Sequence, residues 1–244
     1  MDMQAERMGR GIDLMGDDSA GIFCSEEVMG SSDTMTGDQL RRFIHHQEAL
    51  QNPRLIGYGR QAVMVLATSK GVEYVFKVFK KWEETGPVFA ASYREAVEAS
   101  PFAKECRAFG RLDSLKRNGT WAVRCYGWMK LTDEQFETIG SLVDNHNMSR
   151  WVIVKEHLLK LPLPEDVPAI FAKFDIARLA SILPQDIRMG NYRESKILDL
   201  SGTLTGPCPA WSEFQFHHFY EKTTRRVLDW YECTPLDALD AVYF

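Results

Sequence analysis

The stretch AVMVLATSKGVEYVFKVF, residues 62–79, constrains the fold of this chain more than any other part of its sequence. Residues 63–68 and 72–79 are rich in β-branched and aromatic side chains, which are typical of β-strands. Between them, Ser69-Lys70-Gly71 has the composition of a tight turn. The pattern predicts a β-hairpin whose second strand carries one lysine, Lys77, inside an apolar run. A lysine buried in such a strand needs a carboxylate partner to remain charged.

Composition and charge exclude several classes of protein. The chain of 244 residues is long enough to bury a sizeable core, as one domain or as two lobes. It contains no apolar run of about 20 residues, the length needed to cross a bilayer, so we expect no membrane contact. The net charge is −5 without a basic stripe, which argues against direct binding of nucleic acid. Five cysteines without a CxxC pair indicate reduced thiols and an intracellular location, cytoplasmic or nuclear.

Residues 1–36 differ in composition from the rest of the chain. They contain eight Asp or Glu, two Arg, no Lys and no Pro, without a clear periodicity. This composition predicts a disordered acidic tail. Two roles fit such a tail, a plain leader or a segment that binds a protein partner. Asp38 then has the position of a helix N-cap, and we expect a helix over residues 38–52 that ends before Pro53.

The remainder alternates between helix and strand patterns. A helix is expected after Pro101, with Phe102, Cys106, Phe109 and Leu112 on one apolar face. Strands are expected over residues 120–129 and 149–158, with a polar loop or helix at 131–149 between them. The pattern after residue 160 predicts an amphipathic helix over 165–183, a short β-hairpin over 192–198 and a helix over 213–232.

Small residues before the hairpin and an acidic residue after it are candidates to share a site with Lys77. The motif GYGRQA places Gly57, Gly59 and Ala62 between two expected strands, where small residues let the backbone approach phosphate oxygens. A simple tight turn explains the same residues. Glu105 is the helical acid flanked by the apolar positions 102, 106 and 109, so it is the expected partner of Lys77.

The stretch LPQDIRMGNYRESKILDLSG, residues 183–202, carries polar side chains at intervals that suit a metal-bound phosphate. Asp186 would accept a hydroxyl proton or orient a nucleophile, and Arg188 would neutralise charge on a transferred phosphoryl group. Asn191 and Asp199 would hold Mg2+, which prefers carboxylate and amide oxygens. Solvated turn chemistry accounts for the same residue types. The choice between the two depends on the rest of the chain.

Taken in order, these motifs resemble the eukaryotic protein-kinase-like fold over roughly residues 53–205. GYGRQA resembles the Gly-rich loop, Lys77 the strand lysine, Glu105 the helix glutamate, PQDIRMGN the catalytic loop and DLSG the metal-binding triplet. VKEHL resembles the hinge, which implies that Glu156 and Leu158 contact the nucleotide. The chain is also similar to a fungal family of small kinase-like proteins grouped with the Fta-type subunit of the inner kinetochore.

The resemblance implies an α+β fold with two lobes, a five-stranded antiparallel sheet in the first and a truncated helical second lobe. We therefore expect an acidic tail over residues 1–36, an N-terminal lobe with a leading helix over 37–160 and a C-terminal lobe over 161–244. The implied cofactors are ATP and Mg2+, so the first expected partner is a nucleotide. A protein partner would bind the acidic tail or the short C-terminal lobe.

The sequence departs from the kinase pattern at several points. Pro184-Gln185 stands where the pattern has His-Arg, DLS replaces Asp-Phe-Gly, and only 45 residues follow Asp199. Three functional classes stay open. The first is an atypical kinase that transfers phosphoryl from ATP to a protein or small-molecule hydroxyl. The second is a pseudokinase, a non-catalytic interaction subunit that the narrower resemblance places at the kinetochore. The third is a domain whose polar residues are purely structural.

Overall fold

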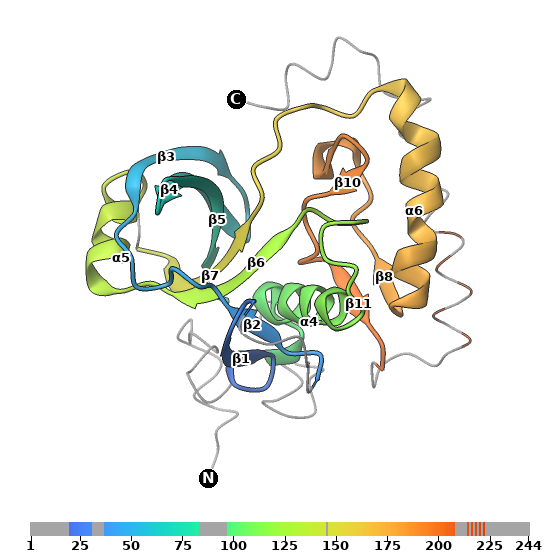
Figure 1. The fold of residues 1–244 in the computed structure, drawn as a ribbon, viewed down its shortest axis with the longest axis horizontal. Helices are drawn as coiled ribbons and strands as arrows, with labels where there is room; N and C mark the ends of the chain where they lie inside the picture. The colour runs from blue at the N-terminus through green and yellow to red at the C-terminus, as the bar shows by residue number, and fades with distance from the viewer. Residues whose placement is uncertain are drawn as a thin grey trace.

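The computed structural model of this chain describes residues 20–30, 37–82, 97–144 and 146–207, and residues 214, 216, 218, 220 and 222. These residues form an α+β fold built around one large sheet (Figure 1). The strands of the sheet are β1 (Cys24–Val28), β2 (Leu40–Arg42), β3 (Gln51–Tyr58), β4 (Ala62–Ser69), β5 (Val72–Lys80), β6 (Cys125–Lys130) and β7 (Met148–Lys155). The helices are α4 (Pro101–Ser114), α5 (Asp133–Gly140) and α6 (Val167–Leu179).

The predicted hairpin is present in the sheet as strands β4 and β5. Strands β4 and β5 pair from Ala62 and Phe79 to Ser69 and Val72, and they turn at Ser69-Lys70-Gly71 as predicted. The full strand order is β1-β2-β6-β7-β5-β4-β3. The pairs from β6 to β3 are all antiparallel, so five strands of the sheet have the arrangement that the resemblance implied, although the sheet itself is larger than the five strands expected. The pairs β1–β2 and β2–β6 are parallel and extend the sheet to seven strands.

Two predictions for the N-terminal region were wrong. Residues 24–28 were expected within a disordered tail, but they form β1 at the edge of the sheet, with Phe23 and Cys24 buried. Residues 38–52 were expected as a helix, but Leu40 begins a strand and Pro53 lies inside β3. Leu40 is buried on the sheet, and this tertiary contact outweighs local helix propensity. Residues 1–19 and 31–36 of the expected tail lie outside the described residues.

The two faces of the sheet are covered by different helices. Strand alternation sends Lys77 and Phe79 of β5 toward α4, while Phe76 and Val78 point to the opposite face. That opposite face packs against α5, whose Ile139 is fully buried. Each helix begins at a sequence signal: Ser100 caps α4 ahead of Pro101, and a Thr132–Gln135 capping box opens α5. The face of the sheet on which a strand side chain lies therefore decides whether that side chain packs against α4 or against α5.

Helix α4 packs by the face that the sequence predicted. Phe102, Cys106, Phe109 and Leu112 are all buried in the cluster that also contains the β-sheet residues Phe79 and Ile153. The three cysteines of the described ranges are buried free thiols. Two of them, Cys24 and Cys106, lie with their sulfur atoms 3.7 Å apart. Burial raises the pKa of the Cys106 thiol well above its ordinary value, so these groups behave as apolar core atoms.

The segment after β7 adds α6 and four short strands, β8 (Ile182–Pro184), β9 (Tyr192–Arg193), β10 (Lys196–Ile197) and β11 (Thr203–Thr205). Helix α6 and the β9–β10 hairpin were both predicted, and β8 pairs with β11. Of the helix expected over 213–232, only alternate residues from 214 to 222 are described, and these are helical. Tyr220 donates a hydrogen bond to the Phe174 carbonyl, which attaches this segment to α6.

Candidate functional site

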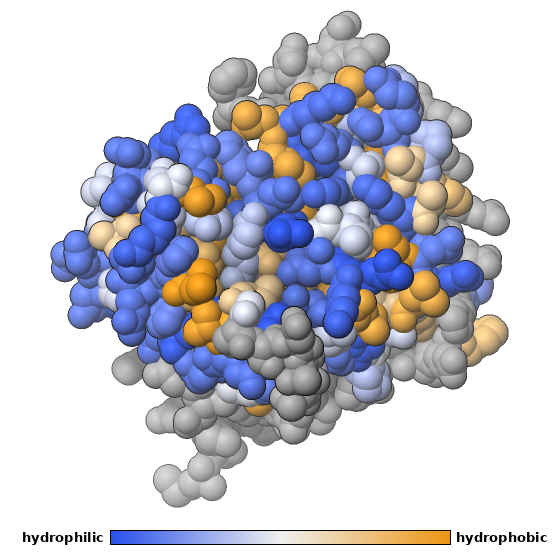
Figure 2. All heavy atoms as spheres, viewed as in Figure 1, coloured by the Kyte–Doolittle hydropathy of each residue, from blue (hydrophilic) through white to orange (hydrophobic). Residues whose placement is uncertain are grey.

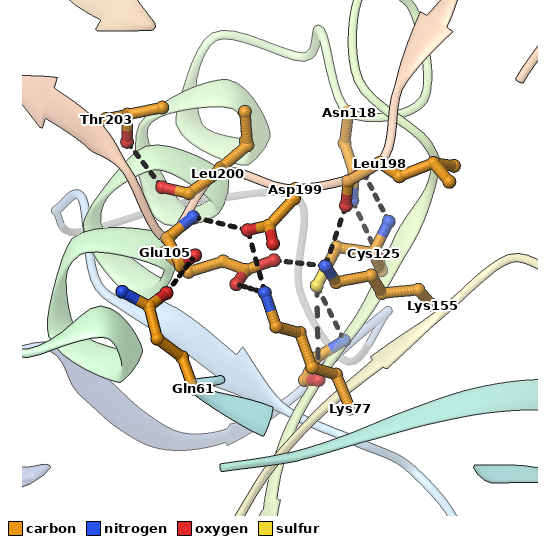
Figure 3. A network of polar contacts seen from close by, with 12 residues as sticks. Gln61, Lys77, Glu105, Asn118, Cys125, Lys155, Leu198, Asp199, Leu200 and Thr203 are labelled. Atoms are coloured by element: carbon orange, nitrogen blue, oxygen red, sulfur yellow. Dashed lines mark hydrogen bonds and ion pairs between the residues drawn. The ribbon is translucent and has the colours of Figure 1, made fainter. Parts of the chain in front are cut away.

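Lys77, Glu105 and Asp199 meet on the α4 face of the sheet (Figure 3). The Lys77 ammonium group lies 2.7 Å from Glu105 Oε2 and 2.7 Å from Asp199 Oδ1. Glu105 is fully buried and Lys77 almost fully, while the Asp199 side chain is one third exposed. The predicted Lys77–Glu105 pair is confirmed, and residues that are 122 positions apart, Lys77 and Asp199, are in direct contact.

A second lysine belongs to the same network and was not predicted. Lys155, the last residue of β7, contacts Glu105 Oε1 and donates to the Leu198 carbonyl oxygen at 2.8 Å. Lys155 and Lys77 lie on the same face because Lys155 pairs with Val75, two residues before Lys77 on β5. The sequence held a usable signal, since WVIVK repeats the pattern of YVFKVF, a lysine within an apolar strand. The network therefore contains two lysines and two carboxylates.

The electrostatics of the two lysines differ. Burial alone would lower the pKa of Lys77, but Asp199 and Glu105 more than offset burial and hold that pKa above its ordinary value. Burial also lowers the pKa of Lys155, and Glu105 offsets it only in part because Lys77 acts in the same direction as burial. Burial would raise the pKa of Asp199, yet Lys77 and Lys155 hold it well below its usual range. Asp199 is a carboxylate at neutral pH.

The glycine motif forms a tight turn that is tied to the same network. The Gly59 N–H donates to the Ala62 carbonyl at 2.9 Å and closes the turn between β3 and β4. Gly57 lies beside Met64, where a Cβ would come within 2.8 Å of the Met64 methyl carbon. In the turn, the Gln61 amide oxygen accepts a hydrogen bond from the Ser201 hydroxyl at 2.9 Å. The Ser201 N–H in turn donates to Asp199 Oδ1 at 2.8 Å, so the turn contacts the segment that holds Asp199.

The residues predicted to be catalytic lie at the surface and contact each other. Asp186 and Arg188 are exposed, and they form an ion pair of 3.1 Å. Asn191 is buried, and its amide nitrogen donates to the Asp186 carbonyl at 2.9 Å. The Leu198 N–H donates to the Asn191 carbonyl at 2.7 Å, which joins this loop to the segment that carries Asp199. The structure thus links the predicted loop residues to one another through loop-shaping hydrogen bonds.

The two residues of the hinge-like segment, Glu156 and Leu158, also contact other parts of this chain. Glu156 Oε2 accepts hydrogen bonds from Lys196 Nζ at 3.0 Å and from the Arg124 N–H at 3.2 Å. Leu158 is half-buried and packs against the core cluster on the α4 side. Contact of either residue with a nucleotide remains a prediction.

The residues expected to hold Mg2+ are only Asp199 and Asn191, and metal binding by them stays a prediction. Asp199 Oδ1 already accepts from Lys77 and Ser201, and Asn191 uses its amide nitrogen, not its oxygen, to hydrogen-bond the Asp186 carbonyl. Among the described residues, no group of three or more His, Cys, Asp or Glu side chains could hold a metal ion. Mg2+ requires near-octahedral oxygen ligation, and one carboxylate facing two lysines supplies little of it. The arrangement is a neutral ion network within the protein.

Three further findings bear on the kind of protein this is. None of the described helices is long and apolar enough to cross a membrane. No curated protein matches the chain in sequence. The family model of the kinetochore Sim4 complex subunit FTA2 matches residues 28–204, a range that contains β2 to β10, most of β11 and every residue of the network. Because that match covers most of the 244 residues, the chain belongs to the FTA2 family of kinetochore Sim4 complex subunits.

Proposed function

We propose that this chain acts as a non-catalytic interaction subunit of a kinetochore complex in the nucleus. The observation that carries the proposal is the family match over residues 28–204, since the family is described as a subunit of a kinetochore complex. A subunit works through contacts with other proteins, so its partners are proteins. The finer placement of those contacts, on the acidic segment 1–36 or on the chain after residue 161, stays a prediction.

The site geometry supports a structural role for the charged residues. Lys77, Lys155, Glu105 and Asp199 join β5, β7, α4 and the segment after β10, and each ion faces an opposite charge. The exposed Asp186 and Arg188 neutralise each other. A network of this kind holds helix, sheet and loop in one arrangement, which is what a binding subunit requires of its core.

The surface is compatible with protein contacts at more than one place. The face in Figure 2 is mostly hydrophilic, with apolar patches separated by hydrophilic side chains. Several large apolar side chains are exposed, and they come from different elements: Leu55 and Tyr58 of β3, Phe171 and Leu179 of α6, and Leu159 of the segment after β7. Exposed apolar side chains that come from separate elements are usual on protein surfaces, so they do not select one contact surface.

The proposal predicts where the protein is found in the cell. A fluorescently tagged full-length chain at its native expression level is expected to form nuclear foci that coincide with a centromeric histone marker. Chromatin immunoprecipitation of the same fusion should enrich centromeric DNA over chromosome arms, and affinity purification should recover other kinetochore proteins. The untagged strain is the control for enrichment. A diffuse signal without centromeric enrichment would contradict the proposal.

A second candidate function, nucleotide binding on a protein-kinase-like fold, is favoured by one observation. Lys77 contacts both Glu105 and Asp199, as the kinase resemblance implied for residues far apart in the sequence. In this candidate Lys77 and the 57–62 turn would face the phosphates of ATP, and phosphoryl transfer would need Asp186 as the base. A pseudokinase that keeps the nucleotide is compatible with the first proposal.

The second candidate predicts a stabilising effect of ATP. The melting temperature of the wild-type chain should rise in ATP relative to sodium sulfate of equal ionic strength, because a ligand at 100 times its Kd stabilises by about 2.7 kcal/mol. The shift should vanish in Lys77→Met, measured against that variant's own baseline. It should persist in Asp186→Asn, since Asp186 is exposed and paired only with Arg188 among the ion pairs of the described residues. No shift in the wild type would remove this candidate and leave the kinetochore role intact.

A further inference from the structure

We propose that the Lys155 ammonium group takes the place of a divalent cation in the network, so that the folded chain binds no Mg2+ there. This inference concerns the chemistry of the ion network and does not depend on the kinetochore role. It also separates two questions that the kinase resemblance joins, nucleotide binding and metal binding.

The charges of the network require two positive units. Glu105 is fully buried and Asp199 is largely enclosed, and two carboxylates this close are costly without compensation. Lys77 contacts both carboxylates but carries only one charge. One unit of negative charge would remain uncompensated, and the missing unit of positive charge could come from a cation. Lys155 supplies this positive charge instead, through its contact with the second oxygen of Glu105.

The atoms that surround the Lys155 ammonium group are oxygens of the kind that a hard cation prefers. One is the Glu105 carboxylate and the other is the Leu198 carbonyl oxygen at 2.8 Å, one residue before Asp199. Lys77 uses the other Glu105 oxygen and Asp199 Oδ1. Both oxygens of Glu105 are therefore occupied by ammonium groups, as Figure 3 shows.

The walls of this position exclude the water that a metal ion would bring. The Lys155 ammonium group lies 5.3 Å from the centre of the Phe109 ring, and Phe109 is fully buried. The thiols of Cys106 and Cys125 are buried nearby, and burial raises the pKa of Cys125 to about 12, so neither is a thiolate ligand. Mg2+ gives up its hydration waters reluctantly. With the buried Lys155 ammonium group in this position, no room remains for a hydrated ion.

Removal of Lys155 should therefore create the vacancy that a cation can fill. In Lys155→Met the network keeps Lys77, Glu105 and Asp199, with an uncompensated negative charge beside a smaller, uncharged side chain. Lys155→Arg keeps the positive charge and serves as the matched control. The double variant Lys155→Met/Glu105→Gln restores neutrality without a lysine at position 155.

The test is Mn2+ binding to the purified, EDTA-treated full-length chain, followed by the loss of the free-ion electron paramagnetic resonance signal. We expect no bound Mn2+ in the wild type, and a melting temperature that is the same in EDTA and in Mg2+ at equal ionic strength. We expect one Mn2+ per chain in Lys155→Met, with a melting temperature that Mn2+ raises. Lys155→Arg and the double variant should bind none.

Two results would overturn the inference. The first is one Mn2+ bound to the wild-type chain and lost in Asp199→Asn, because the metal site would then exist beside Lys155. The second is a folded Lys155→Met variant that binds no Mn2+. If Lys155→Met does not fold, the double variant decides: its recovery of a cooperative melt supports the charge argument, and its failure to fold contradicts it. None of these readouts depends on centromere localisation or on ATP.

Discussion

Glu105→Ala is expected to lower the free energy of unfolding by about 3–5 kcal/mol, the cost of removing one partner from a buried ion pair. Glu105 is fully buried and is the common partner of Lys77 and Lys155. Its removal leaves Lys155 with only the Leu198 carbonyl oxygen among the network contacts described above. Domains of this size have a free energy of unfolding of about 5–15 kcal/mol in total, so the substitution should remove a large share of that stability.

Denaturant unfolding followed by circular dichroism measures this change, with Glu137→Ala as the control. Glu137 is an exposed residue of α5, and its truncation should change stability by less than about 0.5 kcal/mol. Glu105→Gln should lie between the two, because the amide can still accept a hydrogen bond but carries no charge. Equal stability of Glu105→Ala and Glu137→Ala would show that the network contributes little to the fold, which would weaken the structural role proposed for it.

The part of the site that sequence reasoning predicted follows from periodicity. Residues alternate across a strand, so a lysine within YVFKVF faces a buried layer, and α4 supplies one acid at the matching place, Glu105. The kinase resemblance, and not spacing, assigned Lys77 and Asp199 to one site, since 122 residues separate the two. Local patterns gave the pair, and the resemblance gave the third member.

Lys155 was not predicted as part of the network because the kinase resemblance assigned its segment another role. The segment VKEHL was interpreted as a hinge, and that interpretation selected Glu156 and Leu158, of which Glu156 contacts Lys196 and Leu158 packs against the core. The same alternation argument that selected Lys77 applies to Lys155, the third residue on the inward face of WVIVK after Trp151 and Ile153. Its role in balancing the charge of Glu105 depends on the pairing of β5 with β7 and on the position of Glu105 between the two lysines. A local sequence pattern contains neither.

The parallel edge of the sheet could not be predicted from local pattern. Strand β2 is only three residues long, and its pairing with β6 joins Arg42 to Trp128 across 86 positions. Its neighbours in the sequence, with a cap-like Asp38 and helix-forming residues, favour a helix on propensity alone. Burial of Leu40 under α4 and pairing on both sides decide in favour of the strand. Non-local contacts of this kind carry no signature in a short window.

The same packing leads to a second prediction with a large effect, and it concerns Gly110 in the middle of α4. Glycine normally weakens a helix by about 1 kcal/mol relative to alanine, so Gly110→Ala should stabilise an isolated α4. In the folded chain the backbone just before β2 crosses α4 at this residue. A Cβ at Gly110 would lie 2.8 Å from the Asp38 carbonyl carbon and 2.9 Å from the Gln39 carbonyl carbon, and closer still to the Asp38 carbonyl oxygen. These are backbone atoms, which cannot rotate away as a side chain can.

We therefore expect Gly110→Ala to destabilise the protein by about 1–3 kcal/mol or more, the range found for overpacked cores. Gly37→Ala is the matched control, because a Cβ there meets no atom within 4 Å and the backbone is not left-handed. Separation of α4 from residues 38–39 would also break the Arg111–Asp38 ion pair and the Ser114–Asp38 hydrogen bond, so amide hydrogen exchange should rise across β1 and β2 before the rest of the sheet. A Gly110→Ala variant as stable as the wild type would mean that β2 and the preceding turn do not pack on α4, and that β1 and β2 belong to a separate, loosely held edge.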